Sequence, residues 1–276
     1  MNARIDKSQF GPWAVITGAS SGIGREFARQ IAHAGLNTVL VGRRSALLDD
    51  VGRSLTRNSG VQFRVITADF SEDDFITTVA RQTADLDVGL LVSNAGTPSP
   101  GKFLSLDRAE LADGLRLNAL SHLEIAHHFG RRLVSRGRGG LLFVGAMGAG
   151  KGVPYMVNDS AAKAYVHGLA KGLHQELKPA GIHVTLLAPG PTDTPALAVL
   201  GLTPENLPMR PTKVDLCVSE ALRSLAANRA LIIPGRMNRM MDALVPEGLA
   251  QKMMGKMFQK SLAAKTPPPQ AQAQVG

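Results

Sequence analysis

Residues 13–28 read Trp-Ala-Val-Ile-Thr-Gly-Ala-Ser-Ser-Gly-Ile-Gly-Arg-Glu-Phe-Ala. The first five form a short apolar run, as in a buried strand, and helical periodicity begins near residue 22. The glycines at 18, 22 and 24 let the backbone approach a pyrophosphate at the amino terminus of a helix, where free N–H groups and the helix dipole favour an anion. The stretch therefore predicts a dinucleotide-binding turn made of Gly18, Ser20, Ser21, Gly22, Ile23 and Gly24.

The same alternation continues along the chain, with short apolar runs between longer segments of helical period. Continuous apolar runs are typical of parallel strands covered on both faces. Strands that alternate with helices predict βαβ units, so we expect one doubly wound α/β domain, a Rossmann fold with seven parallel strands and helices on both faces. The strands are expected at 13–17, 38–41, 63–66, 90–92, 141–144, 184–187 and 231–233, and the helices at about 22–34, 45–58, 72–84, 107–135, 159–178 and 213–227.

Composition narrows the class of protein. The chain has 276 residues and no internal linker, which favours a single domain over 1–264, and the Pro-, Gln- and Ala-rich end at 265–276 is expected to be a disordered tail. The net charge is +9, but aromatic residues make up only 4%, too few for the stacking surfaces of a nucleic-acid binder. With Cys217 as the one cysteine, an internal disulfide is impossible. A reducing, cytoplasmic location fits best, because neither a signal peptide nor a membrane-spanning run is visible.

The second predicted strand ends in Leu40-Val41-Gly42-Arg43-Arg44. An acidic residue at this place would accept the ribose hydroxyls of NAD. Arginine suits the 2′-phosphate of NADP instead, because a guanidinium binds phosphate through charge-assisted hydrogen bonds. The sequence therefore predicts NADP(H), with Arg43 and Arg44 in the cofactor site.

Together these residues resemble the short-chain dehydrogenase/reductase family over roughly residues 10 to 235. The glycine turn is similar to the cofactor loop of that family, and Arg43-Arg44 resembles the ending of its NADP(H)-preferring members. Ser93-Asn94-Ala95-Gly96 resembles the family's Asn-Asn-Ala-Gly element. The resemblance implies an adenine contact at Asp69 and Phe70, further cofactor contacts at Asn94, Ala95 and Gly96, and a segment over the nicotinamide that includes Pro189, Gly190, Thr192 and Thr194.

The family's catalytic Asn-Ser-Tyr-Lys set is matched only in part. Asn118 fits the asparagine and Lys163 the lysine, which also binds ribose in the family. Asp159 stands where the family has tyrosine, one turn before Lys163, and Ala146 stands where it has serine. The resemblance thus implies an oxidoreductase that acts on a carbonyl or hydroxyl group, but with the two groups that touch the substrate oxygen replaced.

This replacement has a chemical cost. An ionised aspartate accepts hydrogen bonds but donates none, and alanine has no donor in its side chain. We expect Lys163 to hold Asp159 charged and to lower the pKa of its carboxyl further. Loss of a general acid and of one oxyanion donor slows such a reaction by at most about 10⁴–10⁷-fold, since the two effects rarely add in full. Tyr155 is a weaker candidate for a displaced proton donor, Ser160 points elsewhere, and His167 is expected in the core or at an interface.

Three hypotheses follow for the activity. The first is an NADP(H)-dependent oxidoreductase for a small, apolar or lipid-like substrate. The second is a catalytically impaired cofactor-binding pseudoenzyme, a sensor or a scaffold, and the third is a non-redox enzyme with Asp159 as base. No spacing of histidines indicates a metal site.

Residues 237–262 carry six of the ten methionines and lysines at 252, 256 and 260. Methionines at such spacing usually fill a core. The alternatives are an adaptable lid over a lipid-like substrate, or peripheral contact of two helices, separated at Pro246 and Gly248, with an anionic membrane. A homo-oligomer is possible.

Overall fold

The computed structural model describes residues 5–203, 207 and 210–265. Seven parallel strands form one sheet in the order β3-β2-β1-β4-β5-β6-β7. This arrangement confirms the doubly wound sheet expected from the sequence. The strands are β1 (Trp13–Thr17), β2 (Asn37–Gly42), β3 (Phe63–Thr67), β4 (Val88–Ser93), β5 (Gly139–Val144), β6 (Ile182–Leu187) and β7 (Leu231–Ile232).

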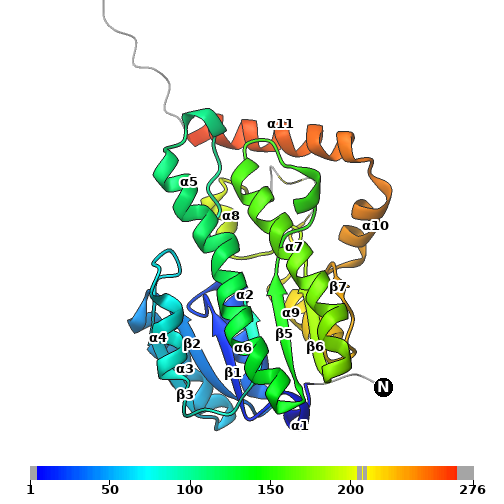
Figure 1. The fold of residues 1–276 in the computed structure, drawn as a ribbon. Helices are drawn as coiled ribbons and strands as arrows, with labels where there is room; N and C mark the ends of the chain where they lie inside the picture. Colours follow the sequence, from blue (N-terminus) through cyan, green and yellow to red (C-terminus); the bar gives the residue numbers. More distant parts are fainter. Residues whose placement is uncertain (1–4, 204–206, 208–209, 266–276) are drawn as a thin grey trace, which may run out of the picture.

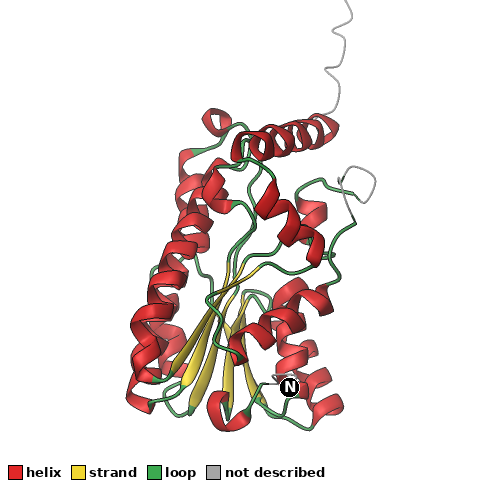
Figure 2. Ribbon diagram, turned by 90° about the vertical axis from the view of Figure 1, so that its right-hand side faces the viewer, coloured by secondary structure: helices red, strands yellow, loops and turns green. Residues whose placement is uncertain are grey.

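Helices cover both faces of this sheet, as Figures 1 and 2 show. The helices α2, α3 and α9 contribute to one apolar core, and α4, α6 and α7 to the other. The α-helices are α1 (Lys7–Phe10), α2 (Gly22–His33), α3 (Ser45–Ser59), α4 (Phe75–Gln82), α5 (Arg108–Leu115), α6 (Ser121–Arg136), α7 (Val157–Leu177), α8 (Ala196–Val199), α9 (Val214–Ala226), α10 (Arg236–Leu244) and α11 (Glu247–Lys265). Short turns form η1 (Phe103–Ser105), η2 (Arg116–Leu120), η3 (Ala149–Lys151) and η4 (Lys178–Ala180).

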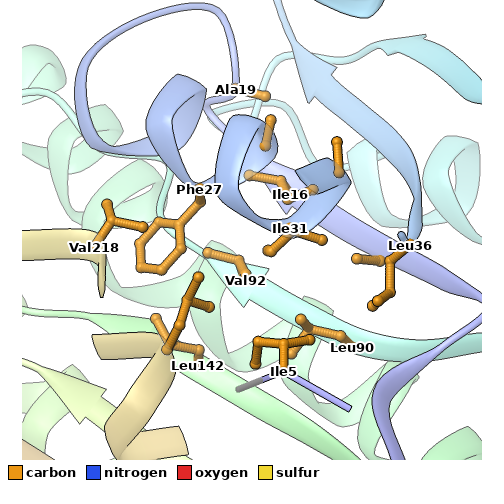
Figure 3. Close-up of a cluster of buried hydrophobic side chains, with 14 of the residues drawn as sticks. Ile5, Ile16, Ala19, Phe27, Ile31, Leu36, Leu90, Val92, Leu142 and Val218 are labelled. Carbon is orange, nitrogen blue, oxygen red and sulfur yellow. The ribbon is translucent and has the colours of Figure 1, made fainter. Parts of the chain in front are cut away.

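The core explains why the central strands are apolar along their whole length. Figure 3 shows Phe27 and Ile31 of α2 against Ile16 of β1 and Val92 of β4, all fully buried. Burial of a side chain of this size contributes about 1.5–3 kcal/mol. The two edge strands differ from the prediction: β3 and β7 are only partly buried, because each has a neighbouring strand on one side alone.

Two further differences concern helices. The helix expected at 107–135 is divided into α5, the π-helical turn η2 and α6, and η2 places Asn118. Lys265, which the prediction placed in the tail, is the last residue of α11, and the rest of the predicted tail, 266–276, lies outside the described residues. In the part of the chain that the structure describes, no helix has both the length and the apolar character needed to cross a membrane.

Candidate functional site

The carboxyl ends of β1 and β4 lie side by side, where the strand order reverses and sheets of this kind bind ligands. Thr17, the last residue of β1, joins the two ends. Its Oγ1 accepts from the backbone N–H of Asn94 at 2.8 Å and of Ala95 at 2.9 Å. The Asn94 amide donates to Thr17 O at 2.8 Å. The glycine turn after β1 and the Asn-Ala-Gly segment after β4 are therefore held in one place.

The glycines of the predicted cofactor turn pack closely against neighbouring segments, where a side chain would not fit without a shift. Gly18 and Gly22 have positive φ angles of +68° and +54°, which favour glycine. A Cβ on Gly18 or on Gly24 would collide with the Asn94 amide. Across the site, a Cβ on Gly96 would lie 2.6 Å from Asn118 Oδ1 and 3.2 Å from Lys163 Nζ. The backbone thus forms a cradle at the start of α2, whose helix dipole favours an anion there. Ile23 lies in the first turn of α2.

The two arginines after β2 take different positions. Arg44 reaches the glycine turn, where its Nη2 donates to Ser20 Oγ at 2.7 Å and to Ser21 Oγ at 3.1 Å. Arg43 is 62% exposed, and its Nη1 lies 3.6 Å from Asp69 Oδ2. Phe70, predicted as a cofactor contact, is buried against Phe75. Both guanidinium groups border the predicted cofactor site.

The segment after β6 closes the same edge of the sheet. The Thr194 side chain lies next to Gly22, so this segment meets the cofactor turn. Thr192 forms a bridge with Thr212. Asn238 of α10 supports the segment. A Cβ on Gly190 would lie 3.0 Å from the Asn238 amide. The same amide donates to Thr212 Oγ1 at 3.0 Å. Pro189 accepts at its carbonyl from the Met147 N–H at 2.9 Å.

Asn118 and Asp159 come together as the sequence predicted, through the loop after β4. The Asn118 amide exchanges two hydrogen bonds with the Thr97 backbone, at 3.0 and 3.2 Å. Asp159 is buried in the first turn of α7. Its Oδ2 accepts from the Ser99 N–H at 3.1 Å, and its Oδ1 lies 3.4 Å from Asn118 Nδ2. The carboxyl group therefore anchors the 97–99 backbone.

The net lowering expected for the pKa of Asp159 is wrong, although the charge of Lys163 does act in the expected direction. Burial raises the pKa of the Asp159 carboxyl above its ordinary value, and the Ser99 hydrogen bond and the Lys163 charge offset this only in part. Lys163 turns instead to Val144 O, at 3.1 Å, and to His122 Nε2, at 3.4 Å. Burial is the largest effect on the pKa of both groups, because each charged form loses solvent. It lowers the pKa of Lys163 to about 8.

His122 is the site residue that the sequence reasoning did not select. It is fully buried, and its Nδ1 lies 2.7 Å from Ser93 Oγ. Burial and the Lys163 charge hold the pKa of His122 well below its ordinary value, so the ring is neutral. Its Nε2 lies 3.4 Å from Lys163 Nζ, and a hydrogen bond with the Ala95 backbone offsets the lowering of the His122 pKa only in part. One signal was present in the sequence: His122 lies four residues after Asn118, one helical turn on.

Ala146 follows β5 and lies beside His167. The Ala146 N–H donates to His167 Nε2 at 3.4 Å, and a Cβ on Gly145 would collide with the same ring. Burial lowers the pKa of His167, which favours its neutral form. His167 is thus half-buried against the strand end.

Tyr155 is part of an apolar cluster over the carboxyl end of the sheet. It lies in the loop before α7 with a φ of +64° and packs against buried Val153, Leu202, Leu207 and Phe258. Met156, Met254 and Met257 pack against the same cluster, which brings α11 over the loop that follows Ala146. The Tyr155 ring therefore packs in the wall of this cluster, as expected for a packed residue and not for a displaced proton donor. The apolar side chains around it suit an apolar ligand.

The comparisons with known proteins agree with this arrangement. The model of the family "short chain dehydrogenase" matches residues 12–204. A very-long-chain 3-oxoacyl-CoA reductase of Podospora anserina is 34% identical over 72% of this chain and 66% of its own length. The inactive hydroxysteroid dehydrogenase-like protein 1 of Pongo abelii is 33% identical over 66% of this chain and 56% of its own. The chain thus spans between half and two thirds of these curated relatives.

Among solved structures, a short-chain dehydrogenase from Sphingobium yanoikuyae in complex with NADPH superposes with a TM-score of 0.78. It is 28% identical to this chain, and the match covers 96% of this chain and all of that one. The similarity therefore extends beyond the segment matched by the family model.

Proposed function

Because this chain belongs to the short-chain dehydrogenase family, we propose that it binds NADP(H) and acts as an oxidoreductase on a carbonyl or hydroxyl group of a small, apolar substrate, with weakened proton delivery. One observation carries the proposal. Lys163 and Asn118 lie together at Gly96, which supports the lysine and asparagine roles that the resemblance implies, and the same resemblance assigns Ala146 and Asp159 to the positions of the two hydroxyl groups.

The residues at the strand ends fit the cofactor. Gly18, Gly24 and Gly96 each face a protein atom that a Cβ would strike, so only glycine lets the turn, Asn94, Asn118 and Lys163 come this close together at the strand ends. Arg44 places a guanidinium on the glycine turn and Arg43 places one at the rim, which suits the phosphates of NADP(H). Lys163 faces Gly96 and would hold the ribose. When bound, the cofactor supplies or accepts a hydride.

The side chains of this protein then set the rate at which the substrate oxygen gains its proton. Asp159 delivers a proton only from its protonated form, whose share burial increases. Its carboxyl is shorter than a phenol and already accepts from Ser99 and Asn118, which keeps it close to the 97–99 backbone. Alanine at 146 leaves the oxygen without a side-chain donor. Reduction is therefore slow and depends on pH.

The apolar character of the substrate rests on the cluster around Tyr155 and Phe258. The relatives named above are a reductase of very-long-chain acyl-CoA and a protein related to hydroxysteroid dehydrogenases, which supports the same class.

A second candidate is a cofactor-binding protein without turnover. It is favoured by the hydrogen bonds that hold Asp159 as a structural anchor, and by the relative that is named inactive. The third hypothesis, with Asp159 as the base of a non-redox reaction, has no further observation of its own in its favour, and the hydrogen bonds with Ser99 and Asn118 are those of the structural anchor.

Two measurements test the proposal. Calorimetric titration with NADPH and with NADP⁺ should give saturable binding, and its absence would refute the cofactor site. Single-turnover oxidation of bound NADPH should then be followed against a panel of apolar ketones. Slow oxidation that quickens as the pH falls supports proton delivery from Asp159. Binding without oxidation of NADPH by any ketone supports the second candidate.

A further inference from the structure

The helix α11 crosses the end of the molecule that lies over the carboxyl edge of the sheet (Figures 1 and 2). Its inner face is well packed. Phe258 is buried with Val153 and Leu202, Ser261 is buried, and Gly255 lies against Pro154. The buried residues of this inner face anchor α11 on the rest of the protein.

The outer face of α11 carries apolar residues as well. Leu249 is 52% exposed and Met253 is 40% exposed. They alternate with Lys252, Lys256 and Lys260, which are all exposed. From 248 to 276 the sequence contains four lysines and no acidic residue. A helix that only covered a core would need apolar side chains on one face, so this second apolar and cationic face requires a separate explanation.

Other exposed apolar residues lie on segments at the same end of the molecule. Leu104 in η1 is 96% exposed, the highest value among the large apolar residues that the structure describes, and the exposed Lys102 stands two residues before it. Leu244, at the end of α10, is 72% exposed. Figure 1 places the segment before α5 and the α10–α11 junction at the same end of the molecule as α11. We call the set Leu104, Leu244, Leu249, Lys252, Lys256 and Lys260 the apex surface.

We propose that the apex surface binds the face of a bilayer that contains anionic phospholipids. Leucine tips enter the boundary between headgroups and acyl chains, while lysines keep their ammonium groups at the phosphates. Two copies of the chain that met through this surface would bring their lysines together, which like-charge repulsion opposes. The surface lies over the end of the sheet that carries the candidate site, so bound protein would turn that end toward the lipid. The proposal does not depend on the cofactor or on turnover.

Co-sedimentation of the full chain with vesicles tests this proposal. Wild type should pellet with vesicles of phosphatidylcholine and phosphatidylglycerol, should remain in solution with pure phosphatidylcholine, and should be released by added salt. The triple variant K252E/K256E/K260E should lose about tenfold or more in partition. The control R57E/K171E/K178E changes the net charge equally at exposed positions elsewhere and should retain binding.

The apolar contribution needs its own pair of variants. L104S/L244S should bind anionic vesicles several-fold more weakly. The control Leu47→Ser, at an exposed position of α3, should bind as wild type does. Thermal melting of each variant shows that it is folded. Failure of wild type to pellet with anionic vesicles would overturn the proposal, as would equal loss in both triple variants. A wild-type dimer in solution that L104S/L244S dissociates would assign this surface to self-association instead.

Discussion

The ammonium of Lys163 lies 3.4 Å from Nε2 of His122, a buried ring that Ser93 holds from its other side. This pair gives the site a neutral base behind the lysine, in a place with almost no solvent. Burial lowers the pKa of this lysine to about 8, so its charge changes close to neutral pH.

NADPH affinity should consequently fall as the pH rises through about 8, because the neutral amine loses its charge-assisted hydrogen bonds to the ribose. In Asp159→Asn the same fall should occur at lower pH, since the carboxylate raises the pKa of Lys163 and the amide does not. Titration of NADPH over a pH series measures both. Lys163→Met should bind weakly without this pH dependence, and an unchanged profile in Asp159→Asn would contradict the coupling.

The same lowered pKa makes a prediction for stability. Between about 8 and the ordinary lysine value of 10.5, the unfolded chain binds the Lys163 proton while the folded chain has released it. The contribution of Lys163 to the free energy of unfolding should therefore rise with pH across this window. Urea unfolding of wild type and Lys163→Met, compared at several pH values, isolates that contribution.

NADPH should bind more tightly than NADH, with Arg43 responsible for most of the difference. A hydrogen bond to a charged group contributes about 1.5–3 kcal/mol, so Arg43→Leu should lose roughly ten- to hundredfold in NADPH affinity and little in NADH affinity. Arg44→Leu should weaken both cofactors, because Arg44 lies on the shared glycine turn. The exposed Arg53, paired with Asp50 on α3, provides the control Arg53→Leu. Equal affinity of wild type for the two cofactors would refute the preference.

Restoring the missing hydroxyl groups should restore reduction. Ala146→Ser plus Asp159→Tyr should raise single-turnover oxidation of NADPH by an activated ketone by about 10²-fold or more. Each single change should do less, since the two groups act on one oxygen. Rapid turnover in wild type that Asp159→Ala abolishes would make Asp159 a catalyst in its own right. Rapid turnover that Tyr155→Phe abolishes would assign the proton to Tyr155.

The close contact at Gly96 predicts a sensitive position. Gly96→Ala would place a Cβ 2.6 Å from Asn118 Oδ1, so either the amide or the loop must move. We expect a loss of about 1–3 kcal/mol in stability and weaker NADPH binding. In the matched control Gly168→Ala, the new methyl group meets open space within α7, and stability should rise by about 0.5–1 kcal/mol. Thermal melting with and without NADPH distinguishes the two.

Much of the fold could be predicted because its signals are local. Strand and helix periods repeat along the chain, and the glycines at 18, 22 and 24 stand between the first strand and helix. The division of the predicted helix at 107–135 was not predictable in this way. The π-helical turn at Asn118 follows from contacts with Thr97, which is distant in sequence, and its residues carry no helix-breaking proline or glycine.

The sequence by itself determined the doubly wound sheet. It also predicts the cofactor turn and puts Ala146 and Asp159 where the family has serine and tyrosine, since each depends on residue identity and short-range pattern. Only the tertiary structure decided the chemistry of the groups that remain. Asp159 meets Ser99, and Lys163 meets Val144 and His122, across long stretches of chain. Their pKa values follow from burial in that assembled environment, where loss of water outweighs the charge of a neighbour one helical turn away.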